Sequence, residues 1–124
     1  RRQMADLNAT AKTFVERYGS YSNEAEFQNL IDVFPLMTAS FVETTQGFID
    51  SSTLPEEYYG VTTKVITVNS ESLDEEAGTA TLLLTTQKEE ASGSVGNVNV
   101  RYQDIRLDML KQGGVWKVNL ASWL

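Results

Sequence analysis

Apolar side chains recur at helical spacing through the first half of the chain. Residues 3–19 carry one such stripe, and Gly19 is expected to end this helix in a left-handed conformation. Asn23 has the side chain of an N-cap and predicts a second short helix. Pro35 suits the start of a further helix, predicted over residues 36–51. The apolar positions are Leu7, Ala11, Phe14, Val15 and Tyr18 in the first helix, Phe27, Leu30, Ile31 and Phe34 in the second, and Met37, Phe41, Val42, Phe48 and Ile49 in the third.

The second half is rich in Val, Ile, Thr and Tyr, which is typical of β-strands. Residues 74–78 and the pair Gly113-Gly114 have turn composition between these runs. The sequence therefore predicts one α+β domain over residues 1–124. Its three N-terminal helices would pack on one face of an antiparallel sheet of four or more strands. The predicted strands are 58–73, 79–90, 98–111 and 115–123.

Apolar residues change parity within two of these strands. In the third strand they move from even to odd positions near Gln103-Asp104, and in the first they shift at Val65-Ile66. Side chains alternate between the two faces of a strand, so each shift requires a bulge or a change of the buried face. Two such shifts predict a strongly bent, cone-shaped sheet wrapped around the helices. The third-strand positions are Val98, Val100 and Tyr102, followed by Ile105, Leu107 and Met109.

This order of helices and strands, with a last strand that begins Gly113-Gly114-Val115-Trp116-Lys117-Val118, resembles the nuclear-transport-factor-2-like superfamily. The resemblance covers about residues 8–123 and implies a cystatin-like α+β cone. Members of that superfamily include isomerases and dehydratases as well as non-catalytic domains, so the fold alone does not fix a function.

Within that superfamily, the chain looks most like membrane-anchored, extracytoplasmic members that assemble secretion or envelope complexes. The chain opens Arg1-Arg2 without Met, and paired arginines often flank an apolar span. We therefore expect the domain to belong to a longer single-span protein of the cell membrane, outside the cytoplasm, with a tether upstream of Arg1. A soluble cytoplasmic protein is the alternative.

Charge and composition narrow the classes of partner and chemistry. The 10 basic and 17 acidic residues give a net charge of −7, which argues against nucleic acid as a partner. The chain has no Cys and no His, so it lacks thiolate ligands, imidazole ligands and the commonest general base. We expect no cofactor, no metal site, no catalytic residue and no enzymatic activity.

Four residues are the candidates for lining a pocket in the cone. Asp104 lies where the third strand changes parity, and a buried Asp there could act as a base beside a tyrosine hydroxyl. The competing interpretation is an outward-facing Asp104 paired with Arg101 or Arg106. Large side chains are expected to fill the cone and leave no room for a reactant; these are Phe14, Phe27, Met37 and Phe41. The ligand-binding candidates are Asp104, Tyr102, Tyr18 and Tyr58.

Two functions of different class follow from these observations. The first is a non-catalytic interaction domain that binds other protein subunits and forms a homodimer through the sheet face opposite the helices. The second is a small isomerase-like or dehydratase-like enzyme, or a small-ligand-binding domain, that uses the cone pocket. On the predicted second strand, the mixed polar and apolar side chains of that outer face are Thr81, Leu83, Thr85 and Gln87.

Overall fold

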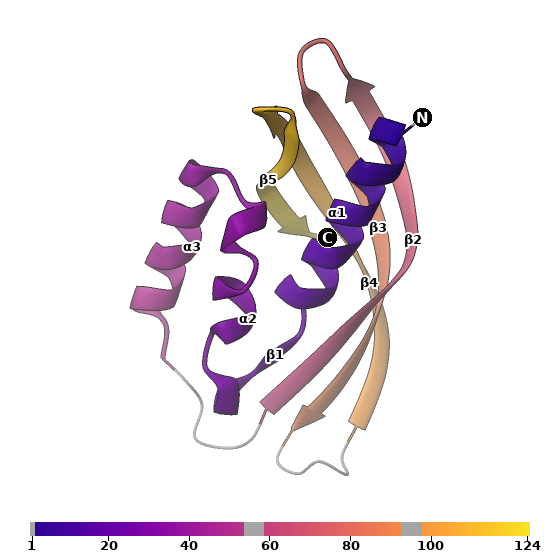
Figure 1. Cartoon of the computed structure of the whole chain (residues 1–124). Coiled ribbons are helices and arrows are strands. Elements are labelled where there is room, and N and C mark those ends of the chain that lie inside the picture. Colours follow the sequence, from indigo (N-terminus) through magenta and orange to yellow (C-terminus); the bar gives the residue numbers. More distant parts are fainter. Residues whose placement is uncertain (1, 54–58, 93–97) are drawn as a thin grey trace.

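The computed structural model describes residues 2–53, 59–92 and 98–124. It confirms an α+β fold in which helices cover one face of an open antiparallel sheet (Figure 1). The sheet has five strands in the order β1-β2-β3-β4-β5, so each strand lies beside its neighbour in the chain. The elements are α1 (Arg2–Tyr18), β1 (Tyr21–Ser22), α2 (Gln28–Ile31), α3 (Ala39–Ser51), β2 (Tyr59–Asp74), β3 (Thr79–Ser92), β4 (Val98–Gln112) and β5 (Val115–Trp123), with two 3₁₀ helices at Asn23–Ala25 and Phe34–Leu36.

The end of α1 is held by a close approach to the sheet. The Thr63 hydroxyl donates a hydrogen bond of 2.6 Å to the Gly19 carbonyl. A Cβ built on Gly19 would lie 2.6 Å from the Thr63 hydroxyl oxygen. The left-handed conformation expected at Gly19 was wrong, since this residue is not among the glycines with positive φ. A glycine is needed here because α1 touches β2.

The segment after α1 differs from the predicted turn and helix. Tyr21 and Ser22 form the short strand β1, which pairs with Gly60 and Val61 of β2. The Ser22 hydroxyl accepts a hydrogen bond from the Glu24 amide, so Ser22 rather than Asn23 is the N-cap of a 3₁₀ turn. The predicted second helix is reduced to one turn of α-helix, α2.

The third helix begins three residues later than predicted, at Ala39. Thr38 is its N-cap, and its hydroxyl accepts a hydrogen bond from the Phe41 amide. The same hydroxyl donates to the Asn119 side-chain oxygen at 2.8 Å. The Thr38 amide also donates to the carbonyl of Val118, so the start of α3 is fixed to β5.

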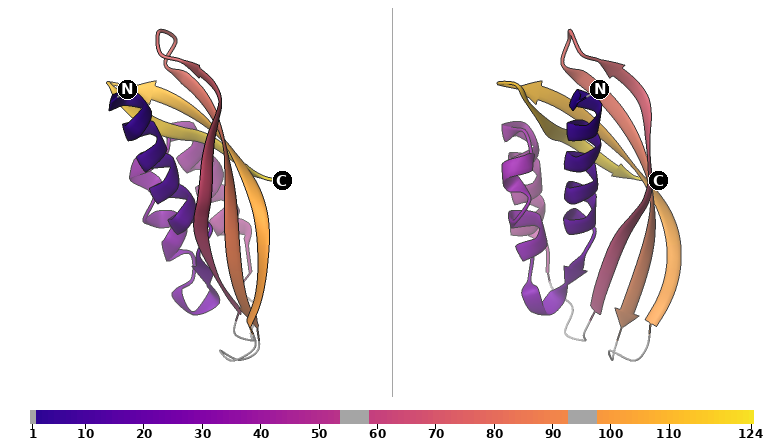
Figure 2. Two further views of the ribbon diagram at one scale, coloured as in Figure 1. Left: turned by 90° about the vertical axis from the view of Figure 1, so that its right-hand side faces the viewer. Right: turned by 45° about the vertical axis from the view of Figure 1, so that its right-hand side comes forward.

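The sheet bends at bulges in β2 and β5 (Figure 2). The β2–β3 register shifts between Val65 and Thr67, where the first parity shift was predicted, and again between Ser70 and Ser72. In β5, Asn119 is an extra residue: its neighbours Val118 and Leu120 pair with Met109 and Asp108, which are adjacent in β4. Near Gln103-Asp104, the second of the two predicted alternatives holds: β3 and β4 pair there without a bulge, and the apolar residues change from the outer to the buried face.

The apolar residues in the two halves of β4 lie on opposite faces of the sheet. Ile105, Leu107 and Met109 face the helices and are fully or almost fully buried. On the other parity, Val98, Val100 and Tyr102 lie on the outer face and are 49%, 54% and 66% exposed. The strand therefore keeps its regular alternation, and its early apolar residues face away from the core. The core consists mainly of Leu7, Phe14, Val15, Val33, Met37, Phe41, Leu82, Leu84, Ile105, Leu107, Met109, Trp116 and Val118.

Candidate binding groove

A groove of about 620 Å³ opens between the helices and the end of the sheet. Its walls come from the end of α1, from β1, from α2 and the turn before it, from α3 and from the end of β5. These segments are far apart in sequence, and the fold brings them together on the helix side of the sheet, away from the β2–β3 turn (Figure 1). The apolar and aromatic lining residues are Tyr18, Tyr21, Phe27, Leu30, Phe41, Phe48, Leu120, Ala121 and Trp123.

Ring contacts hold the aromatic walls in place. Tyr18 stacks between Phe14, with ring centres 4.8 Å apart, and Trp123, at 6.4 Å. On the other side, Phe27 meets the edge of Phe48 at 5.8 Å. Phe48 is 56% exposed, so a large apolar ring stands at the mouth of the groove. Such a surface is suited to bind apolar side chains.

The groove has little acid–base capacity. Its lining, as far as the described residues form it, contains no carboxylate and no Lys or Arg. Burial raises the pKa of the Tyr18 hydroxyl, which therefore stays protonated at neutral pH. The polar lining residues are Asn29, Thr44, Thr45, Ser52 and Thr53, whose side chains can hydrogen-bond but not titrate. The described part of the lining can bind apolar and hydrogen-bonding groups, and no residue in that part is a general base.

One buried cation lies at the edge of the groove. The Lys88 ammonium is 3.5 Å from the centre of the Trp123 ring, and the residue is only 8% exposed. Burial lowers the pKa of Lys88, Arg101 lowers it further, and Glu90 partly opposes this. Lys88 therefore holds the Trp123 ring in place through a cation–π contact.

Of the four predicted pocket residues, the described structure places only Tyr18 in the groove. Asp104 is opposite Thr85 in the register, and it alternates with the buried Ile105, so it lies on the outer face of the sheet. Tyr102 is on the same outer face, and its hydroxyl is 3.3 Å from the Gln87 side-chain nitrogen. Tyr58 lies outside the described residues. Asp104 and Tyr18 are thus on opposite sides of the β-layer.

Large side chains fill the interior beside the groove, but the expectation that they leave no room was wrong, because a groove of about 620 Å³ remains. Phe14, Met37 and Phe41 are buried. Phe27 is only half-buried, and it forms part of the groove wall instead of filling the centre. The groove lies at the open end, where Phe41 forms part of its lining and Phe14 and Met37 do not.

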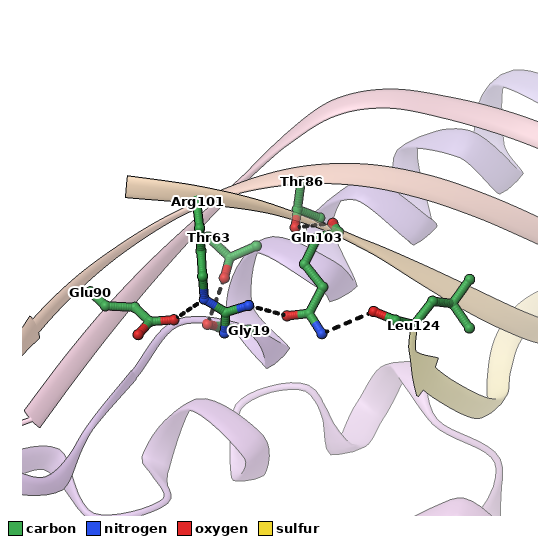
Figure 3. A network of polar contacts seen from close by, with 7 residues as sticks. All are labelled: Gly19, Thr63, Thr86, Glu90, Arg101, Gln103 and Leu124. Atoms are coloured by element: carbon green, nitrogen blue, oxygen red, sulfur yellow. Dashed lines mark hydrogen bonds and ion pairs between the residues drawn. The ribbon is translucent and has the colours of Figure 1, made fainter. Parts of the chain in front are cut away.

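A polar network covers the concave face of the sheet next to the groove (Figure 3). Arg101 pairs with Glu90 and also donates to the side-chain oxygen of Gln103. Gln103 in turn donates to the backbone carbonyl of Leu124 at 3.3 Å. Asp104 therefore has no ion pair with Arg101, whose partner is Glu90, while Arg106 pairs with Glu71.

The sequence did not identify the residues at the mouth of the groove. Phe48 was expected on the inner face of its helix, and Leu120 was not singled out, yet both are exposed there. Helical spacing places Phe48 with Phe41 correctly but does not indicate where the sheet ends. The close pair Lys88 and Trp123 joins strands that are not neighbours in the sheet, so no local pattern could predict it.

The described residues also show what the chain offers to metals and to membranes. No group of three or more acidic side chains is placed to hold a metal ion within those residues. None of the helices in the described part combines the length and the apolar character needed to cross a bilayer.

Comparison with known proteins supports the fold. The chain is similar to the intermembrane-space region of the chloroplast protein ARC6, with a TM-score of 0.56 and 12% identity. The match covers 94% of this chain and 95% of that one. No family model matches the sequence, and no curated protein matches it. At this identity the likeness shows the fold alone, and membership of the nuclear-transport-factor-2-like superfamily stays a prediction.

Proposed function

We propose that this chain is a non-catalytic interaction domain whose groove receives apolar side chains of a protein partner. The observation that carries the proposal is the composition of the groove, which is aromatic and aliphatic with neutral polar groups. Its volume of about 620 Å³ is enough for several side chains. Aromatic anchors of this kind commonly dominate the binding energy of protein interfaces.

The enzymatic alternative would need an acid–base group in the groove. Asp104, the candidate base, faces the other side of the sheet, and the Tyr18 hydroxyl has a raised pKa. A binding role uses the groove as it is, without a side chain that must reorient through the sheet.

The proposal also places the domain outside the cytoplasm, in a membrane-anchored protein that takes part in a larger assembly. The similar region of ARC6 also lies in a space between membranes, which fits this placement. Protease treatment of intact cells that express the full-length protein tests it, since an extracytoplasmic domain is cleaved from outside. Protection until the membrane is opened would favour the cytoplasmic alternative.

We further propose that two copies pair through the outer sheet face and the edge of β4. Among the described residues, β5 pairs with β4 only from Ile105 onward, so the edge at 98–103 has no partner strand. The exposed Val98, Val100 and Tyr102 lie along this edge. A second copy suits it because an unpaired strand can pair with itself, antiparallel, about a two-fold axis.

The groove is tested by titrating ¹⁵N-labelled protein with a neutral amphipathic peptide that carries Leu and Phe at helical spacing and Gln elsewhere. We expect shifts of amide signals at Tyr18, Phe27 and Phe48, and of the Trp123 indole. Phe48→Ser is expected to weaken binding while leaving the melting temperature nearly unchanged, because Phe48 is exposed. Absence of shifts in the groove, or shifts confined to other surfaces, would contradict the proposed function.

A further inference from the structure

The negative charge of this chain is concentrated in the segment that builds most of the groove. Residues 18–63 contain seven acidic residues and no Lys or Arg. The rest of the chain holds ten acidic and ten basic residues, so the whole net charge of −7 resides in this segment. The segment includes α2, α3 and β1, three of the elements that line the groove.

The described carboxylates of this segment are on the solvent side of the groove walls. Glu26 precedes the lining residue Phe27, and Glu43 and Asp50 are exposed on α3. By helical spacing, Glu43 and Asp50 lie on the side of α3 away from the lining. A helix is about 10 Å across, more than the Debye length of about 8 Å at physiological ionic strength, so salt largely screens these two charges at the groove. The exposed Glu24 and Glu26 lie in the turn before α2, where Glu26 directly precedes the lining residue Phe27, so these carboxylates border the groove.

Basic groups border this region but do not neutralise it. Lys88 lies against the Trp123 ring, and Lys117 donates a hydrogen bond to the Pro35 carbonyl. Asp50 accepts a hydrogen bond from the neutral Gln46 side chain. The two ion pairs within the described residues, Arg101 with Glu90 and Arg106 with Glu71, involve no residue of 18–63.

We propose that the groove binds a basic amphipathic segment of a protein partner. Its apolar side chains enter between Phe27, Phe48 and Trp123, and its Lys or Arg side chains face the carboxylates of Glu24 and Glu26 in the turn before α2. This inference rests on the proposed function and adds the charge of the partner to it. Charge of one sign around an apolar groove selects partners of the opposite sign and speeds their association.

The same charge argues against a lipid surface as the occupant. Membrane surfaces that attract proteins by charge are anionic, and they would be repelled by residues 18–63. A small apolar ligand could fill the groove but would gain nothing from the surrounding carboxylates. A cationic peptide with apolar anchors satisfies both features.

Three synthetic peptides of one design test the inference. They share Leu and Phe at helical spacing and differ in the remaining positions, which are Lys, Gln or Glu. Binding is followed by Trp fluorescence and by amide shifts at low and at high salt. We expect the Lys peptide to bind at least about tenfold more tightly than the Gln peptide at low salt, a difference of about 1.4 kcal/mol, with the Glu peptide weakest. Added salt should remove most of the difference.

Charge-reversal variants provide a matched control. Glu24→Lys combined with Glu26→Lys is expected to erase the preference for the Lys peptide. Glu75→Lys combined with Glu76→Lys makes the same change of net charge at the β2–β3 turn, at the far end of the molecule (Figure 1), and should keep that preference. Phe48→Ser should weaken all three peptides about equally.

The outcomes separate this inference from the proposed function. If the Gln and Lys peptides bind the groove equally at low salt, the groove function stands and the charge inference is wrong. If no peptide shifts the groove signals, both are wrong. Two further results would show that the Lys peptide is attracted to the whole surface of the protein and would overturn the inference. In the first, Phe48→Ser does not change binding of the Lys peptide; in the second, both charge-reversal pairs have the same effect.

Discussion

The ammonium of Lys88 lies 3.5 Å from the centre of the Trp123 ring, across the strand that separates β3 from β5. Burial and Arg101 lower the pKa of this lysine. Removing this charge from water destabilises the fold. The cation–π attraction opposes that cost and fixes one wall of the groove.

Lys88→Met tests this balance. The lost cation–π attraction is worth about 0.5–2 kcal/mol, and relief from burying a charge opposes it, so we expect a net change within about 1 kcal/mol at pH 7. Because the folded-state pKa lies below the ordinary 10.5, the unfolded chain binds more protons in the interval just below pH 10.5. The free energy of unfolding of the wild type should therefore rise with pH there, relative to the variant.

Chemical denaturation of both proteins at a series of pH values measures this difference. The raised tyrosine pKa values of Tyr18, Tyr21 and Tyr59 have the opposite effect, since their stabilisation is lost as pH rises above about 10. They are present in both proteins and largely cancel in the comparison. Parallel curves for wild type and variant would show that Lys88 is not perturbed.

Gly19 and Gly47 form a second pair of tests. A Cβ on Gly19 would lie 2.6 Å from the Thr63 hydroxyl oxygen and 2.9 Å from the Thr63 Cβ. Gly19→Ala is expected to cost about 1–3 kcal/mol of stability, because α1 or β2 must move. Gly47, inside α3, has open space around it, and Gly47→Ala should stabilise by about 0.5–1 kcal/mol. Equal effects of the two substitutions on thermal unfolding would refute the close contact of α1 with β2.

The strands were predictable because alternation and turn residues are local signals. The predicted 115–123 coincides with β5, and the bulge at Val65-Thr67 follows from the parity of apolar residues in β2. The short β1 was missed because Tyr21 becomes a strand only by pairing with the distant Val61.

The candidate site was predicted less well, for a physical reason. Sequence parity indicates that Asp104 and Ile105 face opposite ways, but it does not tell which face is covered. The exposed Val98 and Val100 made the buried face of β4 ambiguous, and the groove depends on where the helices end over the sheet. Of the four predicted ligand-binding residues, only Tyr18 lies in the described groove, through its position on the stripe of α1.

Thr38 is expected to hold the start of α3 to the sheet through its hydroxyl. Thr38→Ala should cost about 1–2 kcal/mol, since it removes both the cap of Phe41 and the hydrogen bond to Asn119. Thr38→Ser keeps both and serves as the control. A double-mutant cycle with Asn119→Ala should give a coupling of about 0.5–1.5 kcal/mol. Additive effects in urea unfolding would mean that the Asn119 contact contributes nothing.

The edge of β4 yields the last prediction. Sedimentation of the wild type is expected to show dimers that increase with concentration, because pairing of this edge would bury Val98, Val100 and Tyr102 from both copies. Val100→Lys puts a charge into that strip and should give a monomer with unchanged secondary structure. Val115→Lys changes another exposed valine, at the start of β5, and should leave dimerisation intact.

Each alternative result of that experiment has a definite meaning. A wild type that is strictly monomeric at millimolar concentration would exclude the dimer. Dimers that survive Val100→Lys but are lost in Val115→Lys would move the interface to the other end of the sheet. Loss of the dimer in Val100→Lys alone would place the interface at the edge of β4 and the outer face. The groove lies on the opposite side of the β-layer, so both copies in the wild-type dimer could bind a partner at once.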